Sequence, residues 1–186
     1  MANTADIRNG LVLDLDGKLM QITYFQHVKP GKGSAFVRTK MRNVRTGAVL
    51  ERTFPSGERF ETVDLTHRPM TYSYRDGENF HFMDLQSFDD IPLTAALIGA
   101  DQMKYLKEGM ECTGLVHDEE VILIELPNFV ELEIVETDPG IRGDTATGGT
   151  KAAKLETGAV VQVPLFIEQG TLIRVDRRED KYLTRV

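Results

Sequence analysis

Met70-Thr71-Tyr72-Ser73-Tyr74-Arg75-Asp76-Gly77-Glu78-Asn79-Phe80-His81-Phe82-Met83 is the stretch of sequence that most clearly decides the fold. Aromatic and polar residues alternate on both sides of Asp76-Gly77, a dipeptide that favours the two-residue turn of a β-hairpin. A second Asp-Gly pair, at residues 16–17, separates an apolar run at residues 11–15 from a β-branched and aromatic run at residues 18–28. Both hairpins predict an all-β protein.

Outward from these hairpins, short β-rich runs recur with turn residues between them, at intervals of roughly ten residues. No long window carries apolar residues at the helical period, and the only helical candidates are residues 93–97 and 102–107. Residues 137–154, rich in Gly, Thr and Asp, are expected to form one long exposed loop. The further predicted strands cover residues 34–42, 48–54, 59–63, 110–116, 121–126, 129–136, 160–164 and 171–176.

A chain of 186 residues allows one to three compact units. Many short strands with regular turns are typical of small barrels and sandwiches. We therefore predict three tandem barrels, with joints near Asp64 and Pro127. The expected domains are residues 1–64, 65–127 and 128–186.

Composition places the chain among folded proteins, because 41% of its residues are hydrophobic and 27% are charged. No apolar run approaches the ~20 residues that a membrane-spanning helix needs. The first residues carry neither an export nor an import signal, so we expect a cytoplasmic protein without a membrane partner. Cys112 is the only cysteine, which excludes an internal disulfide and indicates an inert core thiol.

The net charge of −7 hides an uneven distribution along the chain. Residues 65–128 carry four basic against twelve acidic side chains, whereas no acid occurs between Asp16 and Glu51. That acid-free interval contains Lys18, Lys29, Lys32, Arg38, Lys40, Arg42 and Arg45. Strand alternation places residues 38, 40 and 42 on one face, next to the lysines of the adjoining turn. A cationic surface of this kind is suited to a nucleic-acid backbone.

Pro30-Gly31-Lys32-Gly33 lies between two predicted strands and should form the tip of a hairpin. Proline fixes one backbone angle, and both glycines tolerate left-handed conformations. Lys32 is then the only long side chain at the tip. Its ammonium can enter a narrow space and meet phosphate oxygens as a flexible point charge.

Other chemistries are weakly supported. On the residues Pro30-Gly31-Lys32-Gly33 alone, an ordinary solvated turn is the simpler interpretation. The basic strand that follows them favours RNA contact instead. A phosphate-binding Walker loop fails on spacing, both at Lys32 and in residues 143–150, where Gly149 occupies the lysine position. The four histidines are scattered without metal-ligand spacing, and neighbouring acidic pairs are expected to keep the chain soluble.

Two distant motifs resemble those of one protein family. His27-Val28-Lys29-Pro30-Gly31-Lys32-Gly33-Ser34-Ala35-Phe36-Val37-Arg38 resembles the first-domain loop of the bacterial translation elongation factor P family. The signature of that family's last domain is similar in its spacing, and it is preceded by family-like residues at 137–140 and 143–145. The residues that match this signature are Lys151, Ala153, Gly158, Val161, Val163, Pro164, Ile167 and Gly170.

The resemblance implies an SH3-like barrel followed by two OB-fold barrels, arranged as an L that is similar in shape to tRNA. It also implies a monomeric, non-enzymatic factor that binds the 70S ribosome between the P and E sites and relieves stalling at consecutive prolines. Lys32 would approach the peptidyl-transferase centre beside the P-site peptidyl-tRNA. No cofactor is expected, but a modifying enzyme can extend the equivalent lysine in many relatives.

The resemblance assigns further contacts by position. The loop is shaped by Pro30, Gly31 and Gly33, and the backbone of tRNA or rRNA is expected to meet Lys29, Arg38, Lys40 and Arg42. Contact with the mRNA codon in the E site is expected from Gly143, Asp144 and Thr145, and contact with the small subunit from Tyr182 and Arg185. The alternative function is a generic OB-fold protein that binds free single-stranded RNA.

Overall fold

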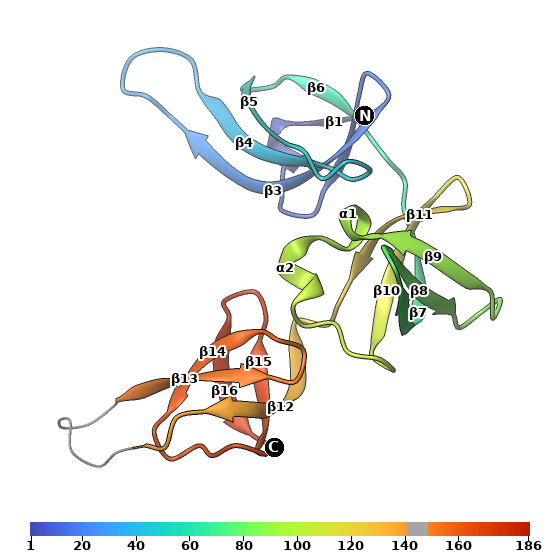
Figure 1. The fold of residues 1–186 in the computed structure, drawn as a ribbon. Coiled ribbons are helices and arrows are strands. Elements are labelled where there is room, and N and C mark those ends of the chain that lie inside the picture. The colour runs from blue at the N-terminus through green and yellow to red at the C-terminus, as the bar shows by residue number, and fades with distance from the viewer. Residues whose placement is uncertain (141–148) are drawn as a thin grey trace.

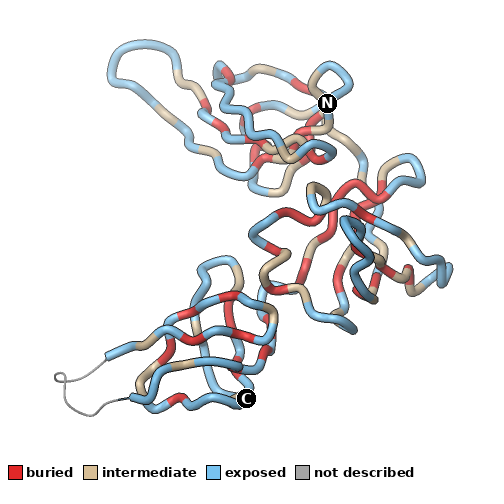
Figure 2. The backbone as a smooth tube through the Cα atoms, in the orientation of Figure 1, coloured by how far each residue is buried: buried red, intermediate tan, exposed pale blue. Residues whose placement is uncertain are grey.

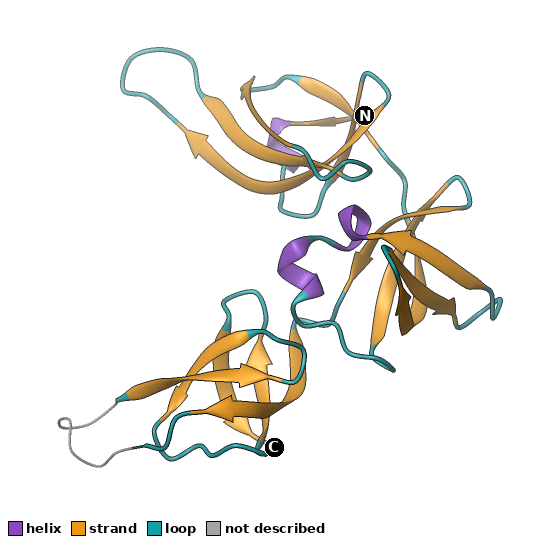
Figure 3. Cartoon of the chain, viewed as in Figure 1, coloured by secondary structure: helices purple, strands orange, loops and turns teal. Residues whose placement is uncertain are grey.

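The computed structural model describes residues 1–140 and 149–186 and is nearly all β-structure, as Figure 3 shows. Its strands form three sheets, and helices occur in the described residues only as one 3-10 turn and two short α-helices. Figure 1 shows three units in a bent row, with the second unit at the bend. The predicted all-β chain of three small, barrel-like units is confirmed.

The first unit is a curled sheet with the strand order β1-β6-β2-β3-β4-β5. Both turn residues between β2 and β3 have positive φ, 53° for Asp16 and 77° for Gly17, as an Asp-Gly hairpin requires. Leu13, Ile22 and Met41 are fully buried inside the sheet. The elements are β1 (Ala2–Asn3), the 3-10 turn η1 (Thr4–Asp6), β2 (Val12–Leu15), β3 (Lys18–Val28), β4 (Phe36–Asn43), β5 (Val49–Pro55) and β6 (Arg59–Thr62).

Strands β3 and β4 form the long hairpin that carries the basic residues. In β4, Val37, Thr39 and Met41 are buried, whereas Arg38 and Lys40 are exposed, so the predicted alternation of faces is confirmed. A bulge between Ile22 and Tyr24 shifts the register of β3 against β4. Because bulges bend and twist a strand, this one can change the direction of the outer half of β3, while the outer half of β4 stays paired with β5.

The second unit is a five-stranded sheet with the order β11-β10-β7-β8-β9. The predicted hairpin at Asp76-Gly77 joins β7 to β8, and the Tyr72 and Phe82 rings lie 5.3 Å apart across it. The elements are β7 (Thr66–Asp76), β8 (Asn79–Asp84), β9 (Asp90–Thr94), α1 (Ala95–Ile98), α2 (Ala100–Met103), β10 (Glu111–His117) and β11 (Glu120–Glu125).

The helical candidates at 93–97 and 102–107 are only partly correct. Leu93 and Thr94 belong to β9, where Leu93 is buried opposite Phe80. The helices that follow have four residues each, because Gly99 between them adopts φ 86° and ψ 140° and breaks the helical backbone. Residues 104–107 are not helical.

The third unit is a closed barrel with the order β12-β13-β14-β16-β15. Antiparallel pairing joins most neighbours, and one parallel contact between β14 and β16, at Gln162 and Lys181, completes the ring. Its strands are β12 (Phe129–Thr137), β13 (Thr150–Leu155), β14 (Val160–Pro164), β15 (Leu172–Asp176) and β16 (Lys181–Arg185).

The prediction that residues 137–154 form one long loop is wrong at both ends. Thr137 ends β12, and residues 150–155 form β13. The inward face of β13 consists of Ala153 and Leu155, which are fully buried, so its pattern lacks the β-branched and aromatic residues by which strands are usually detected. Strand β16 was not predicted either, because its polar residues carry little apolar alternation.

Candidate nucleic-acid interface

The tip loop (residues 29–35) connects the ends of β3 and β4 beyond their last pair, Val28 and Phe36. Gly33 has φ 111°, a conformation that other residues adopt with strain, whereas the φ of Gly31 is not positive. A backbone N–H of Ser56 donates to the Ala35 carbonyl over 2.9 Å, which attaches the base of the loop to the end of β5. The expected left-handed conformation therefore holds for Gly33 alone.

Lys32 is exposed at the far end of this loop, and Figure 1 shows that the loop projects away from the other two units. Residues 29–34 are all exposed, and Figure 2 shows this segment in the colour of exposed residues. Within residues 1–140 and 149–186, no side chain forms an ion pair or hydrogen bond with the Lys32 ammonium. The tip is thus a single cation on a narrow backbone, and it is not folded against its own sheet.

Lys29, Arg38 and Lys40 are exposed on the same hairpin. Lys40 is paired with Glu51 of β5 over 3.1 Å, and both side chains are more than half exposed. Such surface pairs stabilise a protein by at most about 1 kcal/mol, so phosphate groups can compete for the lysine. The Arg38 guanidinium lies 5.6 Å from the centre of the Phe36 ring. These cations and Lys32 form one accessible group.

Arg42 lies apart from that group, at the junction between the first and second units. Its Nη1 donates to the Ala96 carbonyl of α1 over 3.1 Å, and its Nη2 donates to Gln21 Oε1 over 3.3 Å. Its side chain also passes Gly99 so closely that a Cβ at residue 99 would lie 2.5 Å from Nη1. This half-buried position differs from the exposed phosphate contact that the sequence suggested, because sequence alternation cannot reveal a neighbouring domain.

The junction between the first and second units is partly apolar and was not predicted. Val12 and Val44 pack with Leu115, Ile122 and Leu123 in one buried cluster. Arg45 and Glu120 form an ion pair of 2.8 Å across the same junction. Residues far apart in the sequence make these contacts, so no local signal could have revealed them. They give the hairpin a defined direction relative to the rest of the molecule.

Polar contacts cross the junction between the second and third units, where Tyr105 is buried and Asp180 is about half exposed. The Tyr105 hydroxyl donates to Asp180 Oδ1 over 2.6 Å, and Lys104 is ion-paired with the same carboxylate at 2.7 Å. Burial, followed by the hydrogen bond to Asp180, raises the pKa of Tyr105 well above its ordinary value. Arg177 donates to the carbonyls of Leu126 and Pro127 in the connecting segment. The third unit is therefore attached by several directed hydrogen bonds.

The remaining sequence-predicted contacts lie far from the tip. Tyr182 is half-buried on β16 opposite Val175, and Arg185 is exposed on the same strand opposite Ile173. Gly143, Asp144 and Thr145 fall outside the residues that the structure describes. The structure thus places Lys29, Lys32, Arg38 and Lys40 on one hairpin of the first unit and Tyr182 and Arg185 in the third unit.

The cysteine and one of the histidines are engaged in contacts within the fold. Burial raises the pKa of Cys112 to about 12, and its thiol donates weakly to the Met70 carbonyl. His81 is bonded to Asp90 at 2.8 Å. Across residues 1–140 and 149–186, no three His, Cys, Asp or Glu side chains gather in a way that could hold a metal ion. No helix in the described chain is both long and apolar enough to span a bilayer.

Three profiles of one protein family match successive parts of the chain. Residues 3–60 match the elongation factor P KOW-like domain, residues 65–124 match the elongation factor P OB domain, and residues 130–185 match the elongation factor P C-terminal domain. The gaps between the three sheets contain Asp64 and Pro127, the residues at which joints were predicted.

Curated proteins resemble the chain over its full length. It is 54% identical to elongation factor P of Moorella thermoacetica over 185 residues and 51% identical to elongation factor P of Pelotomaculum thermopropionicum over 186 residues, with all of each chain covered. A solved structure of eukaryotic translation initiation factor 5A from Methanococcus jannaschii is 20% identical, has a TM-score of 0.49, and covers 68% of this chain and 90% of that chain. On its sequence, the protein belongs to the elongation factor P family of translation factors.

Proposed function

We propose that this chain binds the 70S ribosome between the P and E sites and stimulates peptide bond formation at consecutive prolines. The observation that supports this proposal best is the exposed Lys32 ammonium at the end of a narrow, projecting loop. A slender cationic tip can reach RNA phosphates at the bottom of a crowded cavity. The likeness of the whole chain to elongation factor P proteins makes the peptidyl-transferase centre the appropriate cavity.

The proposed mechanism is positioning, without catalysis by side chains of the factor. Proline is a conformationally restricted substrate, so the P-site peptidyl-tRNA seldom reaches a geometry that can react. Contacts from Lys32 to the tRNA acceptor end would raise the fraction of reactive geometries and therefore the rate. This task requires neither a general base nor a metal, only a cation held in the right place.

The other cations of the hairpin would hold the factor on RNA. We assign Lys29, Arg38 and Lys40 to the phosphate backbone of tRNA or rRNA, and we assign Arg42 a smaller share because it is bound to Ala96. In the third unit, Tyr182 and Arg185 would contact the small subunit. Gly143, Asp144 and Thr145 would approach the mRNA codon in the E site. The factor would act as a cytoplasmic monomer with the outline of tRNA.

Covalent extension of Lys32 is a further part of the proposal. A modifying enzyme could approach the ammonium freely because the tip loop projects from the sheet. A longer side chain would reach deeper into the cavity without any change in the loop. Intact-mass measurement of the protein from its native cell would show a mass excess, and fragmentation of its peptides would assign that excess to Lys32. An unmodified mass would contradict the extension, and the proposal would then rest on contact by the unmodified lysine.

A reconstituted translation system tests the proposed function. We expect wild-type protein to accelerate synthesis of a peptide with three consecutive prolines and Lys32→Ala to lose this effect while keeping its thermal stability. Lys18→Ala is the matched control, because Lys18 is an exposed lysine of the same unit, at the opposite end of β3. Full acceleration by Lys32→Ala would show that the tip is an ordinary turn.

The generic RNA-binding alternative makes a different prediction in solution. It requires salt-sensitive affinity for isolated single-stranded oligonucleotides and little dependence on Lys32. The middle unit disfavours it, because residues 65–128 carry twelve acidic and four basic side chains. This alternative would be favoured if wild type and Lys32→Ala bound a free oligonucleotide with equal affinity and if the wild-type protein did not accelerate synthesis of the triproline peptide.

A further inference from the structure

The loop between β8 and β9 (residues 85–89, the Phe88 loop) exposes an aromatic side chain. Phe88 is 73% exposed, and in Figure 1 the loop lies at the right of the view, away from the tip loop. One exposed apolar side chain is ordinary on a protein surface. The backbone conformation of Phe88, in contrast, is unusual.

Phe88 has φ 62°, in the left-handed region. The other non-glycine residues with positive φ in the described chain are three aspartates and Glu119. Aspartate tolerates this region because its short side chain bonds locally, but a bulky aromatic residue there is strained. The loop backbone by itself favours glycine or asparagine at position 88. The aromatic ring therefore does not help the loop to adopt its backbone conformation.

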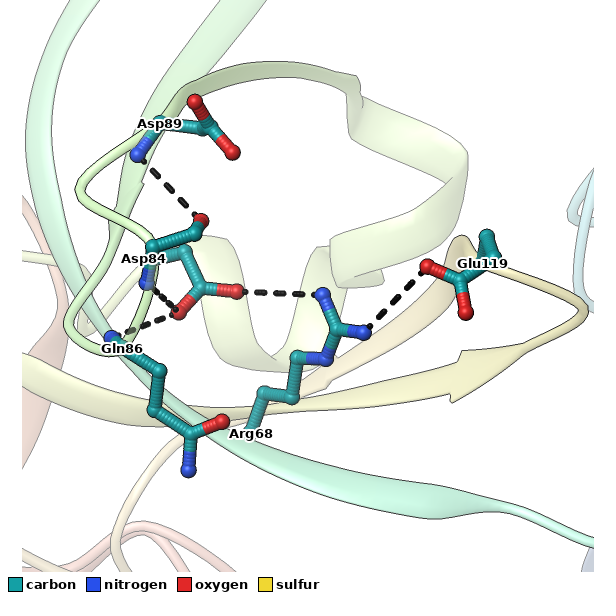
Figure 4. A network of polar contacts seen from close by, with 6 residues as sticks. Arg68, Asp84, Gln86, Asp89 and Glu119 are labelled. Atoms are coloured by element: carbon teal, nitrogen blue, oxygen red, sulfur yellow. Dashed lines mark hydrogen bonds and ion pairs between the residues drawn. The ribbon is translucent and has the colours of Figure 1, made fainter.

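A buried carboxylate organises the loop, as Figure 4 shows. Asp84 Oδ1 accepts hydrogen bonds from the backbone N–H groups of Gln86, at 2.7 Å, and Ser87, at 3.2 Å. Asp84 Oδ2 accepts one from Arg68 Nη1 at 3.4 Å. Asp84 is fully buried, and these bonds, with that from Gln86 first, hold its pKa below the ordinary value. The carboxylate thus stays charged and in place.

The backbone N–H groups of the loop are all bonded as well. The Phe88 N–H donates to the Asp84 carbonyl over 2.8 Å, and the Asp84 N–H donates to the Asp89 carbonyl over 3.0 Å. The N–H groups of Leu85 and Asp89 donate to the Pro69 carbonyl and to Ser87 Oγ. All five amides of residues 85–89 therefore have partners. A loop fixed in this way presents its side chain with little loss of entropy on binding.

Arg68 connects the base of the loop to an acidic cleft. Arg68, which holds Asp84, also approaches Glu119 Oε2 at 3.5 Å, and both Arg68 and Glu119 line a cleft of about 510 Å³ at the junction of the first two units. The carboxylate residues that line the cleft are Asp14, Glu61, Asp64, Asp118 and Glu119. Carboxylates gathered around one cleft suit a long basic side chain.

We propose that Phe88 and this acidic cleft form a docking surface for a basic protein. An apolar pocket of the partner would receive the Phe88 ring, and a neighbouring lysine or arginine would enter the cleft. Charge complementarity selects a protein, because the carboxylates of the cleft and the excess acid of residues 65–128 repel nucleic-acid phosphates. The surface is separate from the tip loop, so one factor can meet RNA and a basic protein at once.

Photo-crosslinking from residue 88 tests the proposal, and it rests on the proposed function because purified 70S ribosomes serve as the probe. We expect benzoyl-phenylalanine at position 88 to give a crosslink that resists ribonuclease and is lost with protease. Position 166 is the matched control, because Phe166 is also exposed, at 72%, but lies in the third unit. A crosslink to RNA, or none at position 88, overturns the proposal. Co-sedimentation of the position-88 variant with 70S ribosomes shows whether ribosome binding itself failed.

A pair of measurements on Phe88→Gly separates docking from folding. We expect the variant to melt a few degrees higher than wild type, because glycine relieves the strained φ. We also expect its affinity for the ribosome to fall about tenfold, since an anchoring aromatic side chain is lost. A lower melting temperature with unchanged affinity would show that the ring only stabilises the fold and would overturn the proposal.

Discussion

The tip loop exposes the cations Lys29 and Lys32, the Phe88 loop exposes an aromatic ring, and the backbones of the two loops differ. In the tip loop, no hydrogen bond joins the backbone of residues 29–34 to any other residue in the described ranges, and the long side chains are cations. In the Phe88 loop, every amide of residues 85–89 is bonded and the side chain is apolar. A flexible charge suits diffuse phosphates, whereas an apolar ring needs a fixed direction to fit a pocket.

The largest effect on activity is expected in the tip loop, where the backbone conformation requires glycine at position 33 but not at position 31. Gly33→Ala places a side chain at φ 111°, which should turn the loop and misplace Lys32. A displacement of about 1 Å can reduce a rate on the order of 100-fold, so most proline-specific acceleration should be lost. The measurement is the rate of triproline synthesis.

Gly31→Ala is the matched control for this prediction. Its φ is not positive, and a Cβ at that position would meet nothing within 4 Å. We expect nearly normal acceleration with this variant. Equal losses from the two substitutions would show that the width of the loop matters, and that the conformation of Gly33 does not.

The next largest effect is expected on stability, in the Phe88 loop. Asp84→Ala removes the acceptor of two backbone N–H groups and the partner of Arg68, which should lower the free energy of unfolding by about 2–3 kcal/mol. Asp89→Ala is the control, because Asp89 is exposed and its substitution should cost no more than about 0.5 kcal/mol. Urea unfolding measures both. Similar values for the two would contradict the role of Asp84.

The same carboxylate makes the stability depend on pH. The pKa of Asp84 is lowered in the folded protein, chiefly by the Gln86 N–H, so its contribution is present above the ordinary carboxyl pKa of about 4. That contribution is lost as the pH falls further, through the lowered pKa. Asp84→Asn should therefore lose less stability than wild type between about pH 5 and pH 2. Parallel curves for the two proteins would contradict this assignment.

The smallest effect is expected at the junction that orients the tip loop. Gly99→Ala places a Cβ 2.5 Å from Arg42 Nη1 and 2.8 Å from Asp101 Oδ1, so it should displace the Arg42 bond to Ala96. Gly57→Ala is the control, because Gly57 has the same φ of 86° but a Cβ there would meet nothing within 4 Å. Gly99→Ala should be less stable than this control by about 1–2 kcal/mol in thermal unfolding. Equal stability of the two variants would show that Arg42 does not stabilise the junction.

Sequence reasoning located those parts of the fold that carry a local signal. Both Asp-Gly hairpins were predicted because turn chemistry and alternation coincide within a few residues. Strand β13 was missed because Ala153 and Leu155 have weak strand propensity, and they pack inward only because the barrel surrounds them. The helices were placed too broadly because Gly99, which separates them, was not recognised as a break.

The candidate site divides in the same way. The tip loop and the exposed faces of Arg38 and Lys40 follow from sequence neighbours. The position of Arg42 and the bond between Tyr105 and Asp180 depend on contacts between distant units, to which local patterns are blind. Phe88 also gave no signal, because a positive φ at a phenylalanine has no signature in the sequence.

Directed hydroxyl-radical cleavage from residue 32 tests the central claim most directly. Lys32→Cys gives one accessible thiol for an iron chelate, since the native Cys112 is buried and its pKa is raised. On ribosomes that carry P-site tRNA, the account predicts cleavage at the acceptor end of that tRNA and in the surrounding rRNA. Binding of the labelled factor with no cleavage near the acceptor end would contradict it.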